Sequence, residues 1–285
     1  MKRAFSLIEL SIVILIIGIL IAGVTQGSRL VKQFRLSNAR SVTQSAPVSS
    51  IKGLMLWLEA TSTASFIESE TEDAAQLTAW YDINPQSPIK NHATRGTASA
   101  NVLYEDDAIN SLPAVYFSGT ASTNSNLAGT VINTINNAFS LFLVVKNTET
   151  ATGNWRAAFR NGAAGGWAYQ KDGQNPSKRD FVFPTVVDCY SSSNISTNSE
   201  VISMTYDGTN LDLLVNGTDE GPSTTTGTAV APTTQYTVGN GGITAGTSPW
   251  MGYIAEVIVF DRALKIEERD SIETYLGKKW GIVVN

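Results

Sequence analysis

The feature that most restricts the fold of this chain is a largely apolar run from Phe5 to Val24 with one charged residue, Glu9, inside it. A run of about 20 apolar residues is long enough to cross a bilayer as a helix. A carboxylate at the centre of such a helix costs about 2.5–3.5 kcal/mol, less near its end, and usually persists because another group pairs with it. Lys2 and Arg3 precede the run, so the positive-inside rule places residue 1 in the cytoplasm and the bulk of the chain outside.

Two other interpretations of this run stay open. A secretory signal peptide has a shorter apolar core without an acidic residue, and no convincing small-residue cleavage pattern follows within Thr25–Arg29. A plain membrane anchor accounts for the run but not for Glu9.

The order of residues 4–9, Ala-Phe-Ser-Leu-Ile-Glu, resembles the class III signal of type IV prepilins, in which Gly more often stands where Ala4 is. The resemblance implies that a prepilin peptidase cuts between Ala4 and Phe5 and N-methylates the new terminus. It also implies that Glu9 pairs with the terminal ammonium of a neighbouring pilin subunit during filament assembly. A buried carboxylate and a buried ammonium are each costly alone and tolerable together.

The helix is predicted to continue after Val24, because apolar residues recur at helical spacing through Leu30, Phe34 and Leu36. Small polar residues and Pro47 then predict a linker over 37–50. We therefore expect a leader at 1–4, a pilin-type hydrophobic transmembrane helix at 5–36, a linker at 37–50 and a second domain at 51–285.

Composition restricts the partners and the compartment. The formal net charge of the 285-residue chain is −5 and it has no basic cluster, which argues against a nucleic-acid partner. Cys189 is the single cysteine, so an internal disulfide is excluded and the exported part depends on its core. Roughly 235 residues beyond the linker suffice for a single-domain core.

The remainder of the chain has the pattern of β-structure. Hairpin turns are predicted at 207–210 and 216–217, where Gly, Asn and Thr residues separate successive strands. Strands are predicted at 54–58, 113–117, 139–145 (apolar on both faces), 201–206, 211–215 and 253–260. A late helix follows from Leu264, with Gly277 as its expected end.

Three segments, 206–217, 252–264 and 268–281, resemble the concanavalin A-like, laminin G-type jelly roll. With Leu56-Trp57-Leu58, the resemblance covers about 51–284. The expected fold class is therefore mainly β: a long N-terminal hydrophobic α-helix followed by a concanavalin A-like jelly-roll β-sandwich.

This fold hosts lectins, adhesion modules and hydrolases, so the fold alone does not determine the activity, which depends on the residues of the site. The Glu-x-Asp-x-x-Glu motif of the retaining hydrolases on this fold is absent, and Glu256 and Asp261 are predicted to be structural. His92 is the sole histidine and is expected in a loop or on the surface. We therefore expect no catalytic residues and no enzyme activity.

Aromatic, glycine and amide residues make the best local pattern for carbohydrate binding, in two separate segments around 154–172 and 239–250. The candidate carbohydrate-binding residues are Trp155, Trp167, Tyr169, Asp172, Asn240 and Trp250. The alternative is that Trp167 and Tyr169 alternate into the core. No cofactor is expected to be required; Ca²⁺ is common in this fold, but no spacing singles out Asp106, Asp107 or Asp188 as ligands.

The sequence thus predicts a modular type IV pilin-like subunit that displays a lectin-like adhesion domain on an extracellular filament, after residence in the inner membrane. Its partners are other pilin subunits, the prepilin peptidase and a glycan or surface protein. Its bulk favours a minor or tip subunit, and because a long linker relieves crowding, a major-subunit role stays open. The alternatives are a pseudopilin of a type II-like secretion system and a membrane-anchored carbohydrate-active enzyme.

Overall fold

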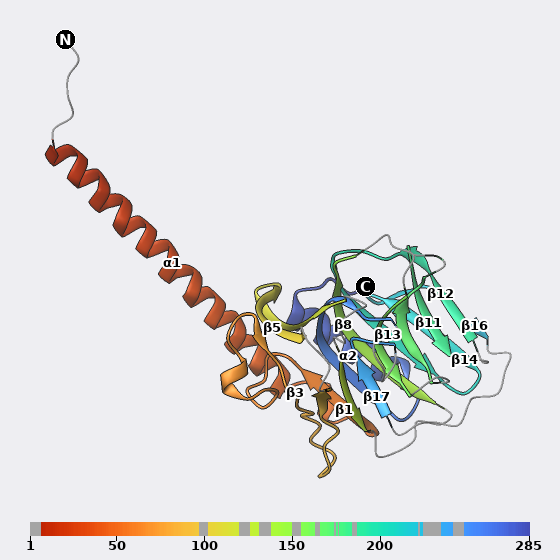
Figure 1. Ribbon diagram of the computed structural model, residues 1–285. Helices are drawn as coiled ribbons and strands as arrows, with labels where there is room; N and C mark the ends of the chain where they lie inside the picture. The colour runs from red at the N-terminus through yellow and green to blue at the C-terminus, as the bar shows by residue number, and fades with distance from the viewer. Residues whose placement is uncertain are drawn as a thin grey trace.

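A computed structural model of the chain describes residues 7–96, 102–119, 126–130, 138–149, 155–162, 166–173, 175, 177–183, 187–221, 223–224, 235–241 and 248–285. It shows a long helix that projects from one end of a two-layered β-sandwich (Figure 1). The predicted fold class, a hydrophobic helix followed by a concanavalin A-like sandwich, is confirmed.

Helix α1 covers Leu7–Gln44 and helix α2 covers Ile266–Trp280, with short 3-10 turns η1 at Pro47–Ser49 and η2 at Glu68–Glu70. The strands are β1 Leu54–Glu59, β2 Ala75–Gln76, β3 Ala79–Trp80, β4 Ala93–Arg95, β5 Val102–Ile109, β6 Leu112–Ser118, β7 Leu127–Thr130, β8 Phe139–Asn147, β9 Arg156–Asn161, β10 Ala168–Lys171, β11 Lys178–Phe183, β12 Val187–Asn194, β13 Ser199–Tyr206, β14 Asn210–Val215, β15 Thr218–Asp219, β16 Ser223–Thr224, β17 Gln235–Val238 and β18 Met251–Phe260.

The strands form two sheets. The first sheet has the order β15-β14-β13-β8-β18-β6-β5-β2, with β1 paired to β18 and β16 paired to β14. The second has the order β12-β11-β10-β9-β17-β7-β4-β3. Neighbours such as β8 and β18 are antiparallel although they are far apart in the sequence, which is expected of a jelly roll rather than of a simple meander.

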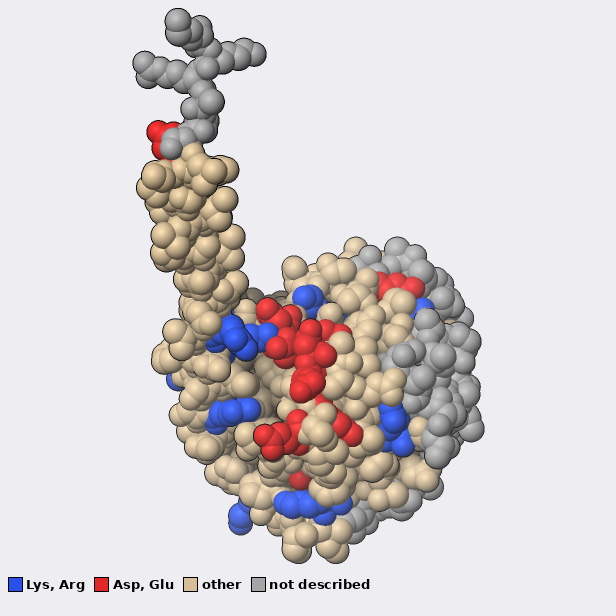
Figure 2. Space-filling view, turned by 60° about the vertical axis from the view of Figure 1, so that its left-hand side comes forward, with Lys and Arg blue, Asp and Glu red and all other residues tan. Residues whose placement is uncertain are grey.

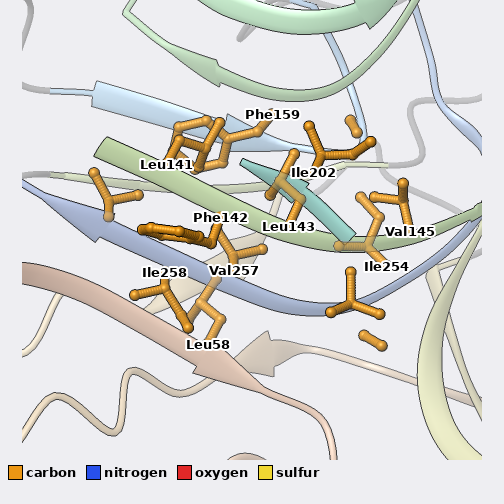
Figure 3. Close-up of a cluster of buried hydrophobic side chains, with 14 of the residues drawn as sticks. Leu58, Leu141, Phe142, Leu143, Val145, Phe159, Ile202, Ile254, Val257 and Ile258 are labelled. Atoms are coloured by element: carbon orange, nitrogen blue, oxygen red, sulfur yellow. The ribbon is translucent and has the colours of Figure 1, made fainter. Parts of the chain in front are cut away.

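The interior of the sandwich is built from alternate residues of the central strands. Phe139 of β8 stacks on Trp167 of the opposite layer, with ring centroids 4.1 Å apart. Because strand residues alternate between faces, Leu141 and Leu143 share the face of Phe139, and Val257 lies opposite Leu143 in the register. Figure 3 shows these aliphatic side chains gathered between β8, β18 and their neighbours.

Helix α2 explains why β8 is apolar on both faces, as predicted. The residues of β8 and β18 that alternate with the interior set, including Phe142 and Ile258, face away from the second sheet. Glu256 shares that face and accepts hydrogen bonds from Tyr275 and Trp280 of α2. A sheet that is covered on both sides needs apolar residues in both registers.

Two sequence-based boundaries are wrong. The segment predicted as a linker, 37–50, is helical through Gln44 and forms η1 at Pro47–Ser49. Ala39 and Thr43 lie one turn apart and are buried against the sandwich, so tertiary packing outweighs the weak local pattern. Helix α2 does not end at Gly277 but at Gly281, whose φ of +65° is the left-handed conformation of a glycine cap.

Candidate functional site

The exposed part of α1, residues 7–34, is the first functional element, and we call it the stem. Its large apolar side chains are solvent-exposed from Leu7 to Phe34, and no residue of this span is buried. By length and composition α1 is a helix that suffices to cross a membrane. Glu9 lies in its first turn, whereas Ala4 and Phe5 lie outside the described residues.

The last turns of α1 dock directly on the sandwich. Ala39 and Thr43 are buried, and Thr43 interacts with the phenol of Tyr275 on α2. The guanidinium of Arg40 donates to the carbonyl of Thr61 at 2.7 Å. The short side chain of Ala39 allows α1 to lie close to α2, and the stem continues into these docked turns as one unbroken helix.

A buried ionic cluster lies beneath this junction, and we call it the Lys279 cluster. The ammonium of Lys279 donates to Glu59 of β1 and, at 2.9 Å, to Glu256 of β18, and all three side chains are fully buried. Burial raises the pKa of Glu256, and the charge of Lys279 opposes that shift.

Neutral donors complete the cluster. Glu256 also accepts hydrogen bonds from the indole of Trp57 at 2.8 Å and from the hydroxyl of Tyr275 at 2.7 Å. The predicted structural role of Glu256 is therefore supported by its contacts. The cluster ties β1, β18 and α2 together directly under the stem.

The structure brings together the two segments that were predicted separately to bind carbohydrate. The backbone N–H of Ala157 donates to the carbonyl of Ser248 at 2.9 Å, and the rings of Tyr169 and Trp250 lie 6.5 Å apart. However, Trp167, Tyr169 and Trp250 are at most 2 % exposed. Aromatic faces that pack in the core are not available to stack on a sugar, so their assignment to a binding surface is wrong.

The remaining candidates of that prediction are also turned inward or only partly exposed. Asp172 is buried and accepts a hydrogen bond from the backbone N–H of Asn175 at 2.7 Å. Asn240 is buried in the turn after β17, where its carbonyl accepts from Thr237. Trp155 is partly exposed and its ring packs close to Gly173.

An open hollow on the outer side of the second sheet was missed by the sequence reasoning. It has a volume of about 360 Å³ and is lined by Lys90, His92, Thr94, Ala128, Gly129, Thr130 and Gln235. The Nδ1 atom of His92 accepts the backbone N–H of Asp82 at 3.0 Å, so in the neutral ring the proton is on Nε2. No single segment of the sequence signals this hollow, because strands β4, β7 and β17 meet only in the fold.

Other predicted side chains are placed more simply. Cys189, the single cysteine, is buried on β12. Asp106 and Asp107 lie on β5, and the side chain of Asp188 is outside the described set. Within the described part of the chain, no group of three His, Cys, Asp or Glu side chains is arranged to hold a metal ion.

Solved structures with a similar fold include sialidases and neurotoxin binding domains. The sialidase of Trypanosoma rangeli in complex with sialic acid has a TM-score of 0.56 at 13% identity, over 83% of this chain and 34% of that one. A structure titled for the interaction of botulinum neurotoxin type C with two ganglioside molecules has a TM-score of 0.55 at 10% identity, over 78% of this chain and 50% of that one. The binding domain of serotype G gives 0.54 at 13% identity, over 79% and 51%.

The chain therefore spans about a third of the sialidase chains and about half of the neurotoxin chains that it matches. At these identities the likeness shows the fold alone. The likeness corrects one expectation: the exclusion of enzyme activity is contradicted, because this fold also occurs in sialidases. None of the curated proteins compared matches the sequence.

Two families match the sequence itself. The prokaryotic N-terminal methylation motif matches residues 1–25, and the concanavalin A-like lectin/glucanases superfamily matches residues 118–268, which is more than half of the chain. The chain therefore belongs to the concanavalin A-like lectin/glucanase superfamily, and it carries a prepilin-type methylation motif on an apolar N-terminal helix.

Proposed function

We propose that this chain is a modular type IV pilin-like subunit that displays its sandwich as a lectin-like adhesion domain on a surface filament. The observation that carries the proposal is the methylation motif at the head of a stem whose apolar side chains are exposed. The stem passes without a linker into the docked turns of α1.

The stem needs an apolar environment. Apolar surface left in water costs about 25 cal/mol per Å², so a helix with this many exposed Leu, Ile and Val side chains is stable only in hydrocarbon or against other helices. Before assembly the inner membrane meets this need, and after assembly the stems of other subunits do. Glu9 then pairs with the methylated terminal amine of a neighbour, where each charge alone would be unfavourable.

The docked junction between α1 and the sandwich suits display. Because Arg40 and Thr43 fix the last turns of α1 to the sandwich, the orientation of the domain follows the orientation of the stem. A filament of packed stems therefore holds each sandwich at a defined angle on its surface. A carbohydrate is the ligand that the superfamily favours, and hydrogen-bonding side chains such as Thr94 and Gln235 line the hollow on the second sheet.

The assembly part is tested by replacing Glu9 in the full-length chain. Glu9→Val removes the charge that pairs with the neighbouring amine, so we expect filaments on the cell surface to be lost while the protein stays in the membrane. Ser11→Val is the matched control, because the one hydrogen bond that the Ser11 hydroxyl makes with the described residues is donated within the helix, to the carbonyl of Ile8 at 2.8 Å. Normal filaments from Glu9→Val contradict the proposal. Wild-type filaments that never leave the periplasm favour the pseudopilin alternative.

The ligand part is tested by presenting the full-length protein in detergent to a glycan array that includes sialylated glycans. These probes are chosen because the similar structures include a sialidase in complex with sialic acid and a neurotoxin that interacts with gangliosides. Thr94→Trp fills the hollow and should abolish binding, whereas Thr274→Trp, on the exposed side of α2, should not. Absence of any bound glycan refutes the lectin role and leaves the assembly role standing.

A further inference from the structure

An acidic surface lies on the sandwich beside the base of the stem, and we call it the acidic face. It consists of Glu72, Asp73, Glu105, Asp106 and Asp107. Strand β2 pairs with β5, with Gln76 opposite Leu103, and the carboxylate of Asp73 accepts the backbone N–H of Asp106 at 3.1 Å. Figure 2 shows acidic side chains gathered beside the base of the helix, next to basic ones.

The acidic face has more negative charge than its own molecule neutralises. Among the described residues its one ion pair joins Asp106 to Lys32 of α1 at 2.7 Å. Five carboxylates therefore face one ammonium. Burial raises the pKa of Glu105, and the nearby charges of Asp73 and Asp106 raise it further.

The complementary charge is on helix α1 of the same chain. Arg29, Lys32 and Arg35 follow the apolar run at intervals of three residues, on neighbouring turns, and we call them the basic collar. Lys32 pairs with Asp106, and Arg35 donates to Asn110 at 3.2 Å. Arg29 is exposed and makes no hydrogen bond or ion pair with the described residues.

A groove separates α1 from the acidic face. One hollow of about 250 Å³ is lined by Arg29, Lys32 and Asp106 among others. It adjoins a second hollow of about 520 Å³, because Leu36, Thr71 and Tyr104 line both. The side of the stem next to the acidic face is therefore open to a second element.

We infer that in the assembled filament the acidic face of one subunit receives the basic collar of a second copy of this chain. The inference rests on the proposed assembly through the stem. Within each copy the basic collar lies at the same height along the stem as the acidic face, because Lys32 pairs with Asp106. Stems that pack side by side and parallel therefore bring the collar of one copy close to the acidic face of its neighbour.

This contact joins different surfaces on the two copies. Such a heterologous contact does not close on itself as a two-fold dimer does, and when the rotation between subunits does not complete a ring it repeats along an open helical array. The contact is also continuous with the apolar stem surface, and it neutralises carboxylates that repel one another within a single subunit. It therefore adds direction and register to the non-directional packing of the stems.

Charge reversal in the full-length chain tests the contact. Arg29→Glu and Asp107→Lys, both at exposed positions, should each lower filament yield about two- to fivefold, the range expected of an exposed ion pair. The two reversals combined should restore the yield to within about twofold of wild type, because the pair is re-formed with opposite polarity. A double variant whose filament yield is no better than that of the weaker single variant overturns the inference. A filament yield that falls when a chelator removes divalent cations, but does not respond to these substitutions, also overturns it.

Cysteine cross-linking tests the same contact directly. Cells that express one chain with Arg29→Cys and another with Asp107→Cys should yield a disulfide-linked heterodimer in sheared filaments; the native Cys189 is buried. Asp219→Cys, on β15 at the opposite edge of the first sheet, is the control and should give none. Filaments without the cross-link refute the interface alone, whereas absence of wild-type filaments refutes the proposed function and the interface with it.

Discussion

Replacement of Lys279 by Met removes the single cation of the Lys279 cluster and nearly preserves the volume of the side chain. In the native protein Lys279 donates to Glu59 and Glu256, and no part of these three side chains is exposed. In the variant two carboxylates remain buried on the same face, with neutral partners such as Tyr275. The variant therefore tests whether the cluster stabilises the junction beneath the stem.

The expected cost follows from this geometry. Removal of one partner from a buried ion pair costs about 3–5 kcal/mol, because the other charge is left uncompensated. For a domain of this size each kcal/mol lowers the melting temperature by about 2–4 °C, so Lys279→Met should lower it by about 6–20 °C. Lys278→Met is the matched control: Lys278 is its exposed neighbour in α2, and its loss should change the melting temperature little.

The pH dependence has a definite sign. The pKa of Glu256 in the folded protein is raised by burial, so protonation of this group favours the folded state below its unfolded pKa, and that contribution is lost as the pH rises. Without Lys279 the pKa rises further. The difference in melting temperature between wild type and Lys279→Met, measured by calorimetry in detergent, should therefore narrow from about pH 8 to about pH 5. A Lys279→Met loss no larger than that of Lys278→Met, or a gap that widens in acid, refutes the reasoning.

Three further substitutions test other parts of the structure. Arg262 holds the pKa of Glu268 at about 2. This partly exposed ion pair should add less than about 1 kcal/mol to the folding stability above pH 4.5, and that contribution is lost as the pH falls toward 2. Glu268→Gln should therefore make the melting temperature fall less steeply in acid. Trp167→Ala should lower the free energy of unfolding by about 3–5 kcal/mol, measured by denaturant titration, because the ring fills the core; an unchanged stability with lost glycan binding would reverse our placement of this residue. Gly281→Ala should cost at least about 1 kcal/mol in the same titration, because φ is +65° and the added Cβ would lie 2.2 Å from the side-chain nitrogen of Asn110; a neutral substitution contradicts the assigned cap.

Much of the fold was predictable because the strongest patterns are local. The apolar run of β8 and the strand-turn-strand pattern of β13 and β14 predict strands directly, and the structure contains them at nearly the same positions. The linker was wrong for a physical reason. Its small polar residues have little intrinsic preference, and the burial of Ala39 and Thr43 against distant elements keeps them helical.

The candidate site was less predictable, because it depends on side-chain direction and on contacts between distant strands. Trp167 and Tyr169 have the composition of a sugar-binding surface, but the register of β10 turns them into the core. The partners of Glu256 come from β1 and α2, up to 199 residues away in the sequence. His92 gave no signal of its own, and its hollow exists only because β4, β7 and β17 are neighbours in the second sheet.

The most direct test of the account is the mass of the N-terminal peptide from protein extracted from native membranes or filaments. If the stem is a processed pilin helix, the mature chain begins at Phe5 and carries one added methyl group, with residues 7–44 still attached to the sandwich. Native protein that retains residues 1–4, or that has lost the apolar helix, would contradict the account.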